Sequence, residues 1–181
     1  MKPWMQWAVG IGLVVAAWGV AAITPVEERR EAPFEVRAAV GEAGVGRNIA
    51  VTVDDVSRSE KVTSGRWVME GNWIVVDLDV AAVTSESGVK LGNIALVVDG
   101  VTFSASERPP SLRNAALHAG VPQSGSVVFE LPKDLDSGRG EIRFSLNTND
   151  RLDSVIVVPI DLSELSTVKN AELVKTHWSN E

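Results

Sequence analysis

The residues best suited to binding a ligand or a partner lie in one long connection, residues 106–123. This connection reads SERPPSLRNAALHAGVPQ. Its arginines and its histidine stand beside two prolines that stiffen the backbone, in a chain whose net charge is −7. Guanidinium groups bind carboxylates and phosphates, so the connection is a candidate binding site for an acidic partner surface or a small anion. The candidate partner-binding residues are Arg108, Pro109, Pro110, Arg113 and His118.

The same connection has an alternative, purely structural interpretation. Apolar residues are as numerous in it as basic ones, and one helical turn would place them over the open end of a sheet sandwich. In that case the stretch is a crossover between two strands. The apolar residues are Leu112, Ala115, Ala116 and Leu117.

Aspartates at alternating positions form a second candidate site. Asp77 and Asp79 would project from the same face of a strand, about 7 Å apart, with Asp54 and Asp55 across from them. Oxygen ligands in such a group bind Ca²⁺. However, aspartates on the wetted face of a strand also keep a sheet soluble. We predict no metal and no other cofactor, with Asp77 and Asp79 retained as the candidate Ca²⁺ ligands.

Catalysis finds little support in the sequence. The two histidines are His118, in the long connection, and His177, near the C-terminus. The chain has no cysteine, and none of its serines occupies a G-x-S-x-G nucleophile elbow. We therefore predict that the protein is not an enzyme. An envelope hydrolase remains an alternative that no constellation of residues supports.

Two tryptophans, Trp67 and Trp73, flank residues 70–72. Indole rings in such a position can stack on a sugar or line a peptide groove. The alternative is that both are ordinary core or edge-capping aromatics, which is the commoner role of tryptophan.

The N-terminal segment Trp4–Ile23 is apolar and contains no charged residue. As a helix it would be about 30 Å long, which is the thickness of the hydrocarbon core of a bilayer. Tryptophans near its two ends suit the headgroup region, and small residues four apart allow close helix packing. The anchor residues are Trp4, Trp7, Gly12, Ala16 and Trp18.

We therefore predict a single-pass transmembrane anchor over residues 1–23. Lys2 precedes the apolar segment, which predicts a cytoplasmic N-terminus and places the rest of the chain outside the cell. The alternative is a cleaved signal peptide, after which the protein would be secreted. Residues 24–33 then form a short charged linker, and residues 34–181 have the length of one ordinary domain. The acidic charge argues against nucleic-acid binding.

Within residues 34–181, short segments alternate between apolar and polar residues and are separated by turn residues. The clearest is Trp73–Val83, where every second residue from Ile74 to Val80 is apolar and should face a core. Asp99-Gly100 between two apolar runs is typical of a tight hairpin. About seven to nine such strands predict an all-β fold, an antiparallel β-sandwich. We also predict a C-terminal edge strand within residues 173–178, the alternative being part of a frayed helix that starts at Ser163.

Two of these segments carry a resemblance to a known family. Gly71 followed by the run Ile74–Val80, and Gly125 followed by Val127–Phe129 and Leu131-Pro132, resemble the exported immunoglobulin-like sandwich domains of Gram-positive bacteria. That family includes a small immunogenic protein secreted by mycobacteria. The resemblance implies an immunoglobulin-like fold and an extracytoplasmic location, and it supplies no catalytic residues. Family members often have an asparagine just after the first of these strands, where this chain has Ala81-Ala82-Val83-Thr84.

These observations predict a membrane-anchored, extracytoplasmic accessory module that docks on an envelope or membrane protein, such as a transporter or a wall-assembly system. Its expected partners are the membrane and that protein. The alternative is an extracytoplasmic sandwich domain that binds a small ligand or Ca²⁺, through residues 106–123 or through the strand that carries Asp77 and Asp79.

Overall fold

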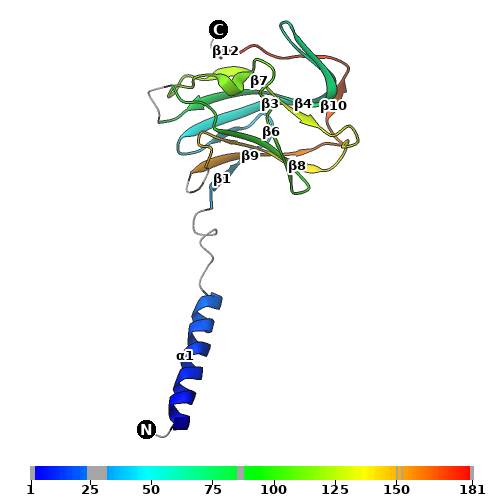
Figure 1. Ribbon diagram of the computed structural model, residues 1–181. Coiled ribbons are helices and arrows are strands. Elements are labelled where there is room, and N and C mark those ends of the chain that lie inside the picture. The colour runs from blue at the N-terminus through cyan, green and yellow to red at the C-terminus, as the bar shows by residue number, and fades with distance from the viewer. Residues whose placement is uncertain (1–2, 24–31, 85–87, 150, 152, 180–181) are drawn as a thin grey trace. The chain divides into compact units, whose positions relative to one another are not determined.

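The computed structural model describes residues 3–23, 32–84, 88–149, 151 and 153–179 (Figure 1). The chain divides into two compact units, Met1–Ala32 and Pro33–Glu181. Most of the predicted linker, at residues 24–31, lies outside the described residues.

The first unit contains the helix α1 (Pro3–Ile23), which has no acidic residue in its first turn and no basic residue in its last. A helix is therefore confirmed where the sequence predicts one. Within the described residues, however, no helix combines the length and the apolar character needed to cross a membrane. The transmembrane anchor predicted for residues 1–23 is not supported by this finding.

The second unit is a β-sandwich of two sheets, as predicted, with β3, β4 and β7 in one layer and β1, β9 and β8 in the other (Figure 1). Sheet A has the strand order β1-β9-β8-β5-β6 and sheet B the order β10-β3-β4-β7-β12, with β2 and β11 also paired to β3. The strands of sheet A are β1 (Phe34–Arg37), β5 (Asn93–Val98), β6 (Val101–Ser104), β8 (Arg139–Ser145) and β9 (Ser154–Asp161). The strands of sheet B are β2 (Ala43–Val45), β3 (Ile49–Ser64), β4 (Trp67–Ala82), β7 (Gln123–Leu131), β10 (Ser166–Val168), β11 (Ala171–Glu172) and β12 (His177–Trp178).

Two features of the sheets differ from the prediction. The described residues contain twelve strands instead of seven to nine, because β2, β10, β11 and β12 are only two or three residues long and carry no alternating pattern of their own. The sandwich is also not wholly antiparallel, since β1 runs parallel to β9, and β10 and β11 run parallel to β3. These pairs join segments far apart in the chain, where no tight hairpin enforces an antiparallel arrangement.

The long hairpin of β3 and β4 corrects a predicted boundary. The sequence suggests a strand that stops at Asp54-Asp55, but β3 continues to Ser64 and β4 begins at Trp67, six residues before the predicted start. The register shifts between Val53 and Asp55, so Asp54 is the extra residue of a bulge. A bulge lets a strand accommodate an unpaired residue and continue.

The hairpin predicted at Asp99-Gly100 is confirmed. β5 and β6 pair antiparallel around it, with Val98 opposite Val101. Asp99 and Gly100 have φ values of 47° and 82°, the left-handed backbone that a two-residue turn of this kind requires and that aspartate and glycine tolerate best. This turn fixes one corner of the outer face of sheet A.

The main core lies between the sheets and contains the apolar residues of β4 predicted to face it, from Ile74 to Val80. A second apolar cluster lies on the other face of sheet B, the face predicted to be mainly wetted. Trp73 and Val75 are buried there beneath Leu173, because the C-terminal segment crosses this face. We call residues 171–179 the C-terminal strap.

Candidate interaction surfaces

The connection at residues 106–123 is built as a crossover between β6 and β7. A short 3₁₀ turn, η1 (Leu112–Asn114), lies in its middle, and Leu112 and Leu117 are fully buried in the main core. Ala115 packs partly against the core, whereas Ala116 is exposed. The structural interpretation of this stretch is therefore confirmed for three of its four apolar residues.

The two arginines of the predicted basic patch each have an acidic partner. Arg108 Nη1 lies 3.1 Å from Glu130 Oε2, at the end of β7. Arg113 Nη2 lies 2.7 Å from Glu107 Oε1, and the other terminal nitrogen of Arg113 donates to the carbonyl of Ala105. These contacts largely neutralise the positive charge that an acidic partner would have to recognise.

The remaining residues of the predicted patch make other contacts. Pro109 is buried, and the carbonyl of Pro110 accepts a hydrogen bond from the Ser64 hydroxyl. The ring centroids of His118 and of Trp178, which lies in the strap, are 6.3 Å apart.

Distance along β7 separates the two ends of the predicted patch. Trp178 pairs with Gln123, at the first residue of β7, whereas Arg108 is bound to Glu130, seven residues further along that strand. Seven residues of β-strand span about 24 Å. The structure therefore does not gather Arg108 and His118 into one site.

The candidate Ca²⁺ ligands are satisfied by serines. Ser126 Oγ donates to Asp77 and Ser124 Oγ donates to Asp79, each from the neighbouring strand β7. Burial raises the pKa of Asp77 above its ordinary value, and the nearby carboxylate of Asp55 adds to that rise. Among the residues that the structure describes, no group of three or more acidic, histidine or cysteine side chains is arranged to hold a metal ion.

Ser126 and Asp79 also attach the C-terminal strap to sheet B. Ser126 Oγ accepts a hydrogen bond from the amide of Val174 at 2.7 Å, and Ser179 Oγ donates to Asp79 at 3.1 Å. A strand is confirmed at His177–Trp178, within the predicted range, where β12 pairs with β7. The aspartates therefore help to hold the strap on sheet B.

The two tryptophans flanking residues 70–72 form a T-shaped pair with ring centroids 5.8 Å apart. Trp73 is fully buried in the cluster beneath the strap, and Trp67 packs against that cluster. The alternative that these are core aromatics is therefore confirmed for Trp73, which has no exposed ring face to offer a sugar.

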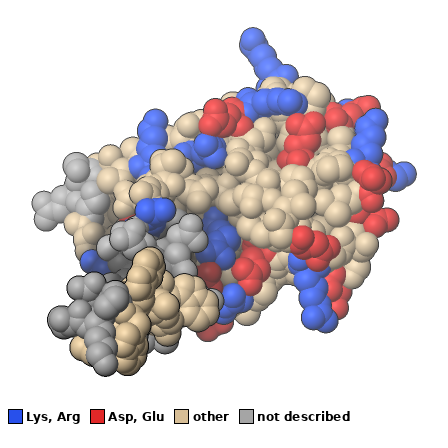
Figure 2. Space-filling model, turned by 60° about the horizontal axis from the view of Figure 1, so that its bottom comes forward, with Lys and Arg blue, Asp and Glu red and all other residues tan. Residues whose placement is uncertain are grey.

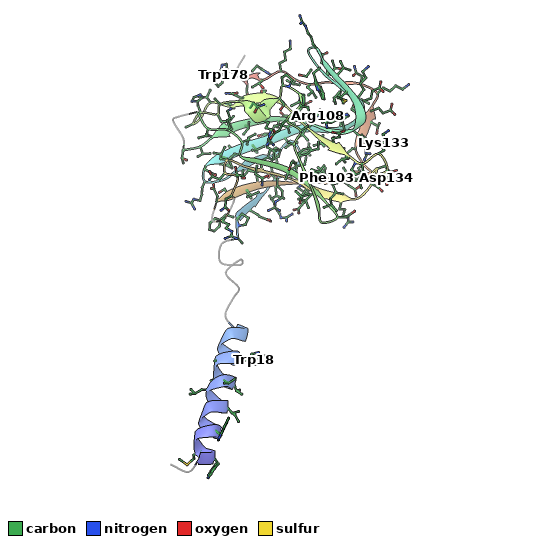
Figure 3. The ribbon with its side chains drawn as sticks, viewed as in Figure 1. Trp18, Phe103, Arg108, Lys133, Asp134 and Trp178 are labelled. Carbon is green, nitrogen blue, oxygen red and sulfur yellow. The ribbon has the colours of Figure 1, made fainter. Side chains whose placement is uncertain are left out.

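The predicted anchor residues on α1 are exposed. Trp4, Trp7 and Trp18 have exposed fractions of 64%, 76% and 74%, and Trp18 projects from the side of the helix (Figure 3). Gly12 and Ala16 are exposed as well. Among the described residues, the helix thus presents large exposed apolar side chains.

Sheet A carries a charge network that the sequence does not reveal. Arg37 on β1 lies 2.8 Å from Glu141 on β8, and Arg143 on β8 lies 2.8 Å from Glu35 on β1. Hydrogen bonding from Arg143 holds the pKa of Glu35 below its usual value, although partial burial opposes that shift. Acidic and basic side chains are accordingly interspersed on the face shown in Figure 2.

The network bridges over β9, which separates β1 from β8. Val155 lies opposite Glu35 and Val157 lies opposite both arginines, and both valines are almost completely buried. Since Ile156 and Val158 face the main core, these valines point outward and are covered by the aliphatic parts of the charged side chains.

Next to the network lies a groove of about 520 Å³ on the outer side of sheet A. Its lining comes from the turn after β5, from the start of β8 and from the end of β9. A smaller hollow of about 280 Å³ shares Pro159, Ile160 and Asp161 with it. We call the two together the acidic groove. Its residues come from distant parts of the sequence, and only the strand registers bring them together.

The comparisons with known proteins name no function for this chain. No protein-family model matches the chain, and no curated protein matches it. A solved structure of an uncharacterized β-sandwich protein from Clostridium difficile 630 is similar, with 12% identity, a TM-score of 0.42, and coverage of 70% of this chain and 96% of that one. None of these findings names the family of exported immunoglobulin-like domains, which stays a prediction.

Proposed function

We propose that the chain is a non-enzymatic accessory module that docks on an envelope or membrane protein, with its sandwich on the extracytoplasmic side. The observation that carries the proposal is α1, a 21-residue helix with no charged residue. Large apolar side chains such as Trp7, Leu13 and Trp18 are exposed along it. Each of them loses roughly 1.5–3 kcal/mol of hydrophobic stabilisation while it faces water. Such a helix is suited to packing against apolar surface in a membrane or a membrane-embedded partner.

The sandwich has what an independent docking domain needs. Its main core is closed by residues of its own two sheets, and its second cluster is closed by its own C-terminal strap. Attachment through α1 would leave the outer face of sheet A, which the strap does not cover, available to a partner without unfolding the domain.

We further propose that the sandwich is immunoglobulin-like. In support, β4 and β7 are neighbours in sheet B, while β5, β8 and β9 are neighbours in sheet A. The strands called B and E, and those called C, F and G, are grouped in the same way in immunoglobulin-like sandwiches. An experimental structure in which β5 paired with β4 instead would overturn this assignment.

Purification of the full chain from its source in mild detergent tests the docking proposal. We expect a stoichiometric membrane or envelope protein to copurify, and we expect the association to be lost in Val14→Arg, which places a charge in the middle of α1. Ser137→Arg adds the same charge on an exposed turn of the sandwich and is the matched control. A monomer that copurifies with nothing, for both the wild type and the control, would overturn the proposal.

Location is tested separately. We expect a reporter fused after Glu181 to be active outside the cytoplasm. A reporter active only in the cytosol would contradict the extracytoplasmic part of the proposal and leave the docking part to the purification experiment.

A further inference from the structure

We propose that the acidic groove binds a cationic peptide segment, one rich in lysine or arginine, on the partner protein. The identity of the partner rests on the proposed function, whereas the preference of the groove for cations rests on its own geometry and charge. The two can therefore fail independently.

The floor of the groove combines apolar side chains with one carboxylate. In the pairing register, Val97 on β5 lies opposite Glu141 on β8, which lies opposite Pro159 on β9. The carboxylate of Glu141 is thus flanked in one row by two apolar side chains. Lysine and arginine have long aliphatic stems with a charged head, so such a row matches them along their length.

The rim of the groove is negative. Asp99 stands at the turn after β5, and Asp161 ends β9 opposite Arg139. The adjoining hollow adds Asp55 and Glu164. The two hollows are therefore lined by four carboxylates and the guanidinium of Arg139, apart from Glu141, which is paired with Arg37 and Arg143.

Two of the carboxylates have neighbours within the chain. Glu141 is paired with Arg37 and Arg143, so its charge is largely compensated. Asp161 accepts hydrogen bonds from the hydroxyl and the amide of Ser163, which keep its pKa below the ordinary value with a smaller contribution from Arg139. Asp161 therefore remains ionised at neutral pH and available to a cation.

Other occupants fit less well. An anion would be repelled by the rim, and a neutral apolar ligand would take carboxylates out of water without compensating their charge. A second copy of the chain carries the same net charge of −7, which opposes association through this face. The groove volume of about 520 Å³ is within the range of sites that hold a small molecule or a few side chains.

The test uses the full-length protein in detergent and fluorescently labelled hexalysine, with hexaglutamate as the opposite-charge probe. Fluorescence anisotropy should detect hexalysine binding at an ionic strength of about 20 mM and a marked loss of affinity at about 150 mM. Hexaglutamate should not bind. Absence of hexalysine binding at low salt would overturn the proposal, even if a partner copurifies in detergent.

The site within the protein is tested by charge-neutralising variants. Asp99→Asn/Asp161→Asn should weaken hexalysine binding about tenfold, because asparagine keeps the turn geometry and the hydrogen-bond acceptor but removes both charges. Asp134→Asn/Glu172→Gln removes two exposed carboxylates that line neither hollow, and it should leave the affinity within about twofold. Equal weakening by the two double variants would mean that bulk charge alone attracts the peptide, and would overturn the site.

A second double variant controls for a folding defect caused by the substitution at Asp161. Asp99→Asn/Glu164→Gln leaves the Asp161–Ser163 hydrogen bonds intact and should also weaken binding, with an unchanged melting temperature. Unchanged binding in this folded variant would overturn the groove as the site. Competition with spermine distinguishes a peptide-binding site from a site for free polyamines. If spermine displaced hexalysine at an equal concentration of positive charge, the assignment of a peptide as the occupant would be overturned.

Discussion

The two sheets of the sandwich treat their outer faces in opposite ways. The outer face of sheet B is closed by the chain itself, because the C-terminal strap buries Leu173 against Trp73 and Val75. On the outer face of sheet A, charged side chains bridge over β9, and an open groove lies beside them. A face sealed by packing serves stability, whereas a face covered by exposed ion pairs can exchange those contacts for a partner's.

The difference between the two outer faces predicts that substitutions in the C-terminal strap cause the largest loss of stability. Leu173→Ala removes a buried side chain from the second apolar cluster, beneath the strap on sheet B. This change should lower the free energy of unfolding by about 2–3 kcal/mol. Val174→Ala, at a neighbouring exposed position, should change it by less than about 0.5 kcal/mol. Chemical denaturation of both variants measures this. Equal effects would mean that the strap does not seal sheet B.

The next effect concerns the pH dependence of stability beneath the strap. Because burial raises the pKa of Asp77 above 3.8, the folded protein retains a proton over a pH range where the unfolded chain has lost it. Stability should therefore fall as pH rises through that range. Asp77→Asn should reduce this fall in thermal melts, and Ser126→Ala, which removes a donor to the carboxylate, should steepen it. A slope identical in all three proteins would contradict this account.

A smaller pH dependence of stability, with the opposite sign, is expected from a carboxylate on sheet A. The pKa of Glu35 is lowered by Arg143, so the stability that Glu35 contributes is present above pH 4.5 and is lost as pH falls through the lowered pKa. Glu35→Gln should cost at most about 0.5 kcal/mol at low salt and nothing measurable in about 1 M salt, since its ion pairs are partly exposed. A loss of stability that persists in about 1 M salt would contradict the view that the outer face of sheet A is covered by ion pairs that salt can screen.

The smallest expected effect is that of Ca²⁺. Asp77 and Asp79 are already hydrogen-bonded to serines on β7, so adding Ca²⁺ or a chelator should leave the melting temperature unchanged. A rise with Ca²⁺ that disappears in Asp79→Asn would favour the ion-binding alternative and would change the view of sheet B as a purely structural face.

The parts of the fold that depend on local pattern could be predicted from the sequence. The alternation from Ile74 to Val80 identified the core face of β4, and Asp99-Gly100 identified a turn, because in both cases neighbouring residues determine the outcome. The continuation of β3 past Asp54 was missed, since two adjacent aspartates resemble a strand end unless one of them occupies a bulge.

The candidate sites were harder to predict because they depend on distant residues. Arg108 and Arg113 appear as a basic patch in the sequence, but whether their charge is available depends on where Glu130 and Glu107 lie. Likewise, Asp161 and Asp99 are separated by a long stretch of chain and share a groove only through the pairing of β5, β8 and β9.

The position of β1 has a mechanical consequence. This four-residue strand is the first element of the sandwich after the linker, and it joins sheet A by parallel pairing with β9. Tension on the N-terminal side would therefore load β1 before any other strand. Its release would take Glu35 and Arg37 away together and uncover the outward-facing valines of β9, while the strap on the opposite sheet stayed in place. Detachment of this one short strand would therefore change the surface that sheet A presents.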